Sequence, residues 1–163
     1  MGEVVVYPSH GVGPIVARER RVVLGVVREV VVLELADGLS VTLPVDLART
    51  QLRPVLSKAA LRLVRETLRD DRPLSEDVWL KRRKDAEVKL AGGDPLGLAE
   101  VVRDGALRER RLREEGRGTM LSAGERSIYM KARRLLSGEI GLAHGLEPVE
   151  ADAWIDRQLG AAA

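Results

Sequence analysis

The chain has 163 residues, of which 45% are apolar, 32% are charged and only 2% are aromatic. It has no cysteine, which excludes disulfides, thiol catalysis and cysteine metal sites and is typical of a reducing cytoplasm. Residues 1–52 carry five of the 27 basic and six of the 25 acidic residues, so the remainder carries 22 and 19 and holds the positive charge. No apolar run reaches membrane-spanning length, so we expect no membrane partner.

The first 52 residues have the pattern of short strands separated by tight turns. His10–Pro14 is expected to be a turn because its glycines can take positive φ, and Asp37-Gly38 is a hairpin signal. So many short strands in so few residues predict a small, bent antiparallel sheet or barrel. The predicted strands are 4–7, 15–24, 26–35 and 39–43.

The strand over 26–35 has more apolar residues than one sheet face requires. Alternation places Val27, Val31, Leu33 and Leu35 toward a core and leaves Val26, Val30 and Val32 on the other face or at an edge. Either that second face binds a partner, or a tightly curled barrel buries both sets.

Helical periodicity begins near Ser57 and continues to the end, so residues 53–163 are predicted to form a bundle of about five helices. The fold class expected is therefore α+β. Its helix caps are Ser57, Ser75, Asp94 before Pro95, and the capping box of Ser122 with Glu125. Gly105 is expected to interrupt the third helix, and residues 108–118 to form a frayed end and a loop. The predicted helices are 58–69, 76–91, 95–107, 123–143 and 148–159.

Trp79 lies in the most unusual part of this half. Helical spacing places Trp79, Arg82, Arg83 and Ala86 on one face, and Lys84 lies beside them. A flat apolar ring among cations suits a nucleic acid, because the cations meet phosphates while the ring stacks on or wedges beside a base. The alternative is that Trp79 packs into the core and the basic residues form a solvated face. A second basic stripe is expected opposite the core of the helix that follows Ser122, from Arg126, Lys131, Arg133 and Arg134.

In this order the parts of the chain resemble the CarD family of bacterial transcription regulators. The resemblance covers nearly the whole chain, and its N-terminal half is also similar to the polymerase-interacting module of transcription-repair coupling factors. It rests on five segments: VVVYPSHGVG at 4–13, LP at 43–44, WLKRRK at 79–84, LAEVVRD at 98–104 and LSAGER at 121–126.

The resemblance implies two binding domains in a bacterial protein that works with RNA polymerase in the cytoplasm. A Tudor-like domain over 1–52 would dock on the β1 lobe of the polymerase β subunit. A helical domain over 53–163 would contact promoter DNA at the upstream edge of the melted region, where a tryptophan wedge stabilises the open complex.

The same resemblance assigns roles to single residues. Trp79 would be the wedge, and Arg82, Arg83, Lys84 and Arg126 would contact phosphates. Arg21 and Val23 match positions used on the polymerase. Thr42 occupies the site where some members have a basic polymerase contact, so the docking surface is expected to differ in detail.

Three other classes of function compete with this interpretation. Catalysis has little support, because the chain has two histidines, no cysteine and no P-loop. A polymerase- or regulator-binding adaptor without significant DNA contact is the closest alternative. A general RNA-binding module is another, although the strands lack the paired aromatics on which such modules stack bases. No metal or other cofactor is expected, and we expect a monomer.

Overall fold

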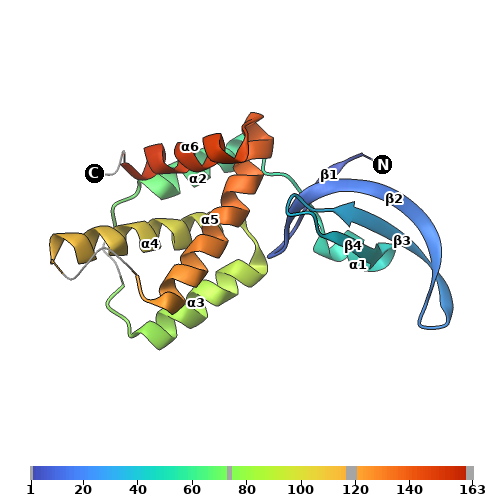
Figure 1. Cartoon of the computed structure of the whole chain (residues 1–163), viewed down its shortest axis with the longest axis horizontal. Coiled ribbons are helices and arrows are strands. Elements are labelled where there is room, and N and C mark those ends of the chain that lie inside the picture. The colour runs from blue at the N-terminus through green and yellow to red at the C-terminus, as the bar shows by residue number, and fades with distance from the viewer. Residues whose placement is uncertain (1, 73–74, 117–120, 161–163) are drawn as a thin grey trace. The chain divides into compact units, whose positions relative to one another are not determined.

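The computed structural model describes residues 2–72, 75–116 and 121–160 and divides the chain into two units, Met1–Val55 and Leu56–Ala163. The first unit is an antiparallel sheet with one short helix, and the second is made of helices (Figure 1). The α+β class is therefore confirmed.

The sheet has the strand order β4-β3-β2-β1-β5, and all neighbours are antiparallel. It does not close, because β4 and β5 are both edges, so the barrel alternative is wrong. The turn expected at His10–Pro14 is shorter than predicted, since β2 already begins at Gly11. The strands are β1 (Val4–Tyr7), β2 (Gly11–Val23), β3 (Val26–Glu34), β4 (Ser40–Pro44) and β5 (Arg53–Pro54).

Strands β2 and β3 form a long curved hairpin, visible in Figure 1 as the outer arm of the sheet. Its two-residue turn is Leu24-Gly25, with φ of 52° and 78°. Positive φ at both positions is the geometry that matches the twist of a tight hairpin. Strand β4 pairs with β3 only over Val30–Glu34, so the end of the hairpin extends beyond the edge strand.

The core of this unit is aliphatic. Val31, Leu33 and Leu35 are buried together with Ala48 of α1 (Val45–Gln51), and Tyr7 packs against the cluster. Two details of the predicted alternation are wrong. Val30 and Val32, which were expected on an open face, are both buried, whereas Val27, which was expected in the core, is 64% exposed.

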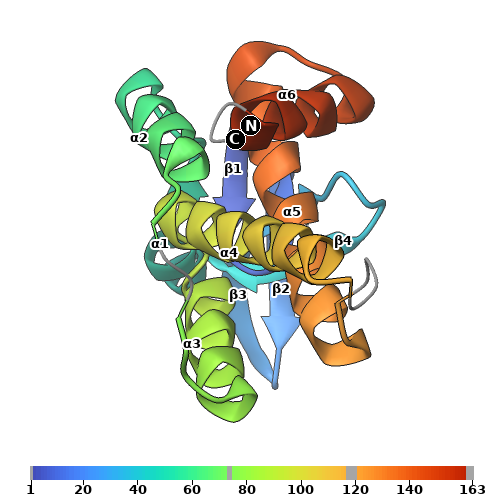
Figure 2. The same cartoon turned by 90° about the vertical axis from the view of Figure 1, so that its left-hand side faces the viewer.

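In the second unit α4 and α5 cross at the centre, α2 and α6 pack on one side of them, and α3 packs on the other (Figures 1 and 2). The described residues of this unit thus form the five helices that the periodicity predicted. They are α2 (Lys58–Arg69), α3 (Trp79–Gly92), α4 (Pro95–Glu114), α5 (Ala123–His144) and α6 (Pro148–Gly160).

Three of the predicted caps are confirmed. Ser57 accepts a hydrogen bond from the amide of Ala60, and Asp94 accepts one from the amide of Leu96. The capping box of Ser122 and Glu125 is complete at the start of α5. Each cap satisfies an amide that the first helical turn leaves without a partner, which fixes where these helices begin.

The prediction for α4 is wrong at its C-terminal end. The helix runs through Gly105 without a break and continues to Glu114, so most of the expected loop is helical. Gly105 lies against the ring of Tyr129 on α5, and a Cβ at this position would collide with that ring. The glycine therefore allows α4 and α5 to approach closely. The remaining part of the predicted loop, 117–118, lies outside the described residues.

Candidate nucleic-acid and polymerase interfaces

Helix α3 begins at Trp79, three residues later than predicted. The Ser75 hydroxyl accepts a hydrogen bond from the amide of Asp77 at 3.1 Å and so stabilises a local turn. The residue that precedes the helix, Val78, provides no side-chain cap. Only Leu90 of α3 is fully buried, so this helix is held by fewer core contacts than its neighbours.

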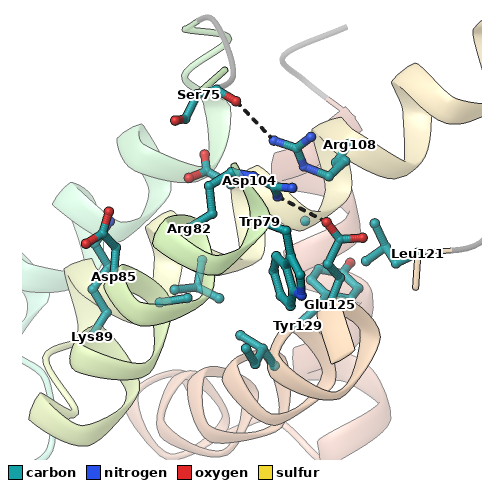
Figure 3. Close-up of a pocket in the computed structure, with 14 residues that line it drawn as sticks. Ser75, Trp79, Arg82, Asp85, Lys89, Asp104, Arg108, Leu121, Glu125 and Tyr129 are labelled. Carbon is teal, nitrogen blue, oxygen red and sulfur yellow. Dashed lines mark hydrogen bonds and ion pairs between the residues drawn. The ribbon is translucent and has the colours of Figure 1, made fainter. Parts of the chain in front are cut away.

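The ring of Trp79 is half-buried between α3 and the start of α5 (Figure 3). It packs on Gly124, where a Cβ would lie 3.2 Å from Cζ2 of the indole. The guanidinium of Arg82 lies 5.2 Å from the ring centroid. The ring is thus neither sealed in the core nor fully exposed to solvent.

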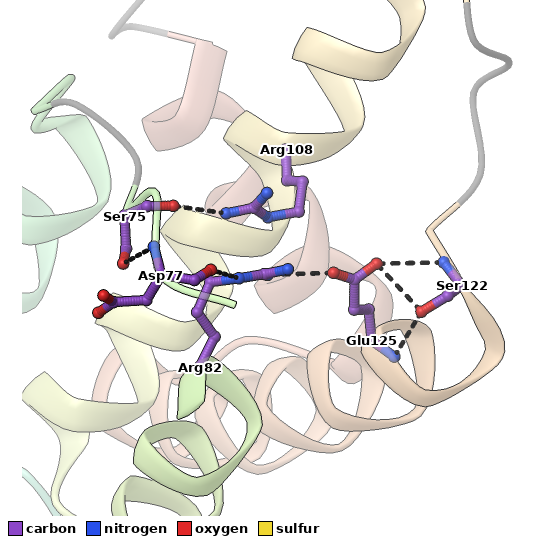
Figure 4. Close-up of polar contacts among 6 residues, drawn as sticks. All are labelled: Ser75, Asp77, Arg82, Arg108, Ser122 and Glu125. Atoms are coloured by element: carbon purple, nitrogen blue, oxygen red, sulfur yellow. Dashed lines mark hydrogen bonds and ion pairs between the residues drawn. The ribbon is translucent and has the colours of Figure 1, made fainter. Parts of the chain in front are cut away.

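Arg82 points inward rather than toward solvent. Its Nε donates to the carbonyl oxygen of Asp77 at 3.0 Å, and its Nη1 donates to Oε1 of Glu125 at 3.0 Å (Figure 4). The side chains of Arg82 and Glu125 are only 20% and 15% exposed. The placement of Arg82 on the same outward face as Arg83 is therefore wrong, because the Glu125 carboxylate draws it into the α3–α5 junction.

Glu125 joins two structural features. Besides pairing with Arg82, it accepts hydrogen bonds from the amide and hydroxyl of Ser122. Burial by itself would raise the pKa of Glu125, but the hydrogen bonds from Arg82 and Ser122 outweigh it, and the pKa lies below its usual value. The carboxylate is consequently charged at neutral pH and links the beginning of α3 to the cap of α5.

Five of the cations predicted around Trp79 and in the second basic stripe are exposed. Arg83 forms a solvent-exposed pair with Glu87 at 2.9 Å, which contributes little and is easily exchanged for a phosphate. Among the described residues no ion pair forms at the other four. These four cations are Lys84 on α3 and Arg126, Lys131 and Arg134 on α5.

Arg133 does not belong to the basic stripe in which it was predicted. Its side chain is 11% exposed and bridges Asp152 and Asp156 of α6, each at 2.6 Å, while Nη1 donates to the Tyr129 hydroxyl at 3.0 Å. Burial would lower the pKa of Arg133, but these hydrogen bonds raise it above its ordinary value. Arg133 therefore holds α5 and α6 together, which explains why it turns away from solvent.

A cavity of about 180 Å³, open on one side to solvent, lies beside Trp79 and is lined by residues of α3, α4 and α5 (Figure 3). Trp79, Ala86 and Tyr129 form part of its apolar wall. One of its polar residues, Arg108, is a feature that the sequence analysis missed, because its segment was assigned to a loop. The signal that could have found it is helical spacing from Val101 through Asp104 to Arg108, which places all three on the cavity side of α4.

The predicted polymerase contacts lie on the curved hairpin and on the edge strand. Arg21 is exposed and pairs with Glu19, Val23 is half-buried, and Thr42 is exposed on β4. The register matches Arg21 with Arg28 and Thr42 with Val32, so both face the same side of the sheet, about 13 Å apart along β3. They share a face but are not neighbours.

The end of the hairpin exposes more apolar surface than the sequence indicated. Leu24 is 98% exposed, and the cross-strand pair Val22 and Val27 is 70% and 64% exposed. Such a cluster of exposed aliphatic side chains on a small sheet is typical of a protein-binding surface. Of the surplus apolar residues of this strand, Val26 lies at the tip of the hairpin and is 53% exposed, as the sequence allowed, whereas Val30 and Val32 are buried.

Within the described parts of the chain no group of three or more histidine and acidic side chains could hold a metal ion, and no helix is long and apolar enough to cross a membrane. The structure is thus an α+β protein of two units, one built on an antiparallel sheet and the other on helices.

Comparison with protein families gives this class a name. Residues 1–56 match the CarD-like/TRCF RID domain, and residues 63–156 match the CarD C-terminal domain. The chain belongs to the CarD family. It is accordingly a transcription regulator that binds RNA polymerase, and its matched domains are regulatory rather than catalytic.

Proposed function

We propose that this protein, acting as a monomer, stabilises the open promoter complex. Its sheet unit docks on the β1 lobe of the polymerase β subunit, and its helical unit contacts promoter DNA at the upstream edge of the melted region. The observation that carries the DNA part is Trp79, whose half-buried ring lies at the start of the weakly packed α3, with exposed cations on α3 and α5. The family match supports the polymerase part.

The ring acts on the junction where paired DNA gives way to single strands. A base step at this junction has lost stacking on one side, and an aromatic ring inserted there replaces it. The ring opposes reannealing because it binds the open form better than the closed form. Stacking of one base on an aromatic side chain contributes about 1–3 kcal/mol, so a gain of about 1.4 kcal/mol would shift the open/closed ratio about tenfold.

Exposed cations supply the affinity that does not depend on sequence. Arg83, Lys84, Arg126, Lys131 and Arg134 can each neutralise a phosphate and release counterions. Arg82 and Arg133 are assigned a different role, since the ion pair of Arg82 joins α3 to α5 and the ion pairs of Arg133 join α5 to α6. So few phosphate contacts give weak binding to free DNA, and docking on polymerase provides the effective concentration that makes it sufficient.

Docking is assigned to the exposed side of the hairpin. Arg21 supplies a charge, Val23 and Leu24 supply apolar surface, and Thr42 extends the same face toward the edge strand. Reversing the charge with Arg21→Glu is expected to weaken binding to the isolated β1 lobe. Normal binding by this variant would place the docking surface elsewhere.

The decisive experiment is the lifetime of the open complex with Trp79→Ala. We expect a lifetime about tenfold shorter than with the wild type while binding to polymerase is unchanged. Leu80→Ala is the matched control, because Leu80 is the next residue of α3 and is 76% exposed. If folded Trp79→Ala leaves the lifetime unchanged, the wedge is disproved. If charge removal at Lys84 and Arg126 also has no effect, the protein is a polymerase-binding adaptor without DNA contact.

A further inference from the structure

The cavity beside Trp79 has the size of one ring system. At about 180 Å³ it is far larger than the roughly 10–15 Å³ that one water molecule needs, and smaller than the roughly 300–1,000 Å³ of pockets for whole drug-sized ligands. Two aromatic side chains, Trp79 and Tyr129, contribute to its wall, and Ile128 and Val101 add aliphatic surface. A flat group with polar edges fits such a wall.

The charges around the cavity are balanced. Arg82, Lys89 and Arg108 are matched by three acidic residues, Asp85, Asp104 and Glu125. Two of the cations are already paired, Arg82 with Glu125 and Lys89 with Glu100 at 2.6 Å. A phosphate would therefore gain little inside the cavity, whereas a neutral heterocycle would find both donors and acceptors there.

Arg108 lines the cavity and has hydrogen-bond donors that are not used in the described structure. In the described structure its only hydrogen bond is a long one, 3.3 Å from Nη2 to the carbonyl oxygen of Ser75, and it forms no ion pair (Figure 3). Burial, helped by the nearby charge of Arg82, lowers its pKa. A half-buried guanidinium with five donors and one weak partner lines the cavity ready for a carbonyl oxygen.

We propose that this cavity binds one unstacked nucleobase, which lies against Trp79 and accepts a hydrogen bond from Arg108. The sugar and phosphates remain outside the cavity. The inference rests on the proposed function, because the ligand expected in the cavity is a base that becomes unstacked at the DNA fork. A free nucleotide offers the same chemistry and is distinguished by the experiment.

Ala86→Leu tests the cavity without changing Trp79 or any charge. Ala86 lines the cavity from α3, so three added carbons would fill part of it, and leucine maintains the helix. Ala91→Leu is the matched control, because Ala91 is exposed on the same helix and does not line the cavity. Arg108→Met keeps much of the side-chain length and removes the donors. Circular dichroism and unfolding curves establish that each full-length variant is folded.

The measurement is binding of full-length protein and polymerase to forked promoter DNA that carries either a base or an abasic sugar at each position of the fork. With wild type and Ala91→Leu, we expect one position at which the abasic sugar weakens binding about tenfold. With Ala86→Leu and Arg108→Met, that dependence should disappear. If abasic sugars do not change binding by the wild type at any position, a base of the melted strand is not the ligand of the cavity.

Titration of the full-length chain with nucleoside monophosphates tests whether a free nucleotide, rather than a base of the DNA, binds in the cavity. A shift of the Trp79 indole resonance that is lost in Ala86→Leu, without any abasic effect, would assign the cavity to a free nucleotide. Absence of both responses overturns the proposal. If Trp79→Ala still shortens the open-complex lifetime in that case, the proposed function stands without the base site, and if it does not, both fail.

Discussion

The helical unit contains two tryptophans that both lie beside an arginine but differ in burial. Trp154 on α6 is 8% exposed, with the His144 ring 5.5 Å and the Arg65 guanidinium 6.0 Å from it. Trp79 on α3 is half-buried, with the Arg82 guanidinium at 5.2 Å. An arginine beside an indole is therefore not a sign of nucleic-acid binding by itself, since both rings have one.

What differs is the packing of the helix that carries each ring. Helix α6 buries five residues against its neighbours, and Arg133 ties it to α5 through two carboxylates. Helix α3 buries only Leu90 and borders a cavity, and its N-terminal end is held to α5 by the Arg82–Glu125 pair. One tryptophan thus belongs to a closed core, and the other lies on a helix with little core of its own.

The largest expected effect compares the two rings directly. Trp154→Ala should reduce the free energy of unfolding by about 3–5 kcal/mol, because it leaves a cavity in a closed core. Trp79→Ala should reduce it by about 1 kcal/mol, since the ring is already half-exposed. Urea unfolding followed by circular dichroism measures both. Equal losses would mean that Trp79 is an ordinary core residue and that the two tryptophans do not differ in their contribution to packing.

The second prediction concerns the arginine that proved to be structural. Arg133→Ala should reduce the free energy of unfolding by about 2 kcal/mol, because it removes charged hydrogen bonds and leaves the Tyr129 hydroxyl without this donor. Arg134→Ala is the matched control, one residue further and exposed, and should change stability by less than about 0.5 kcal/mol. If the two variants were equally stable, the ion pairs between α5 and α6 would not contribute to the free energy of unfolding.

Local signals in the sequence were sufficient for most of the fold. The caps at Ser57, Asp94 and Ser122 depend only on a side chain and amides two or three residues away, so they could be read without tertiary information. The bounds of β1 and the turn at Gly25 were found for the same reason, whereas β2 begins four residues earlier than predicted. Ser75 has the same chemistry but caps a turn, because a short-range pattern does not say whether a helix follows at once.

The candidate site depended on contacts that are distant in the chain. Arg82 turns inward because Glu125 lies 43 positions later, and Arg133 turns inward because α6 brings two aspartates to it. Gly105 stays helical because it meets Tyr129, which no local propensity reveals. Periodicity assigns a residue to a face of its helix, but the neighbour that covers this face is known only from the tertiary structure.

The third prediction uses pH to test the link between α3 and α5. Because the pKa of Glu125 is lower in the folded protein than the usual value, its charge stabilises the fold above about pH 4.3, and this contribution is lost as the pH falls through the folded pKa. Glu125→Gln keeps a residue that can complete the capping box but removes the charge. It should cost about 1 kcal/mol at pH 7, and this difference should shrink as the pH falls below about 4.3. A difference that does not depend on pH would show that the charge plays no part.

The smallest expected effect separates exposed cations from those that hold the structure. Lys84→Ala and Arg126→Ala should each lower the salt dependence of DNA binding by about one released ion, with little change in stability. Arg157→Ala is the control, since Arg157 is exposed on α6, which packs on the other side of the central helices from α3. Binding of forked promoter DNA by the polymerase complex at several salt concentrations gives the slopes. If Arg157 changed the slope as much as Lys84, the DNA would follow general surface charge, and the difference between the two tryptophan regions would not extend to DNA binding.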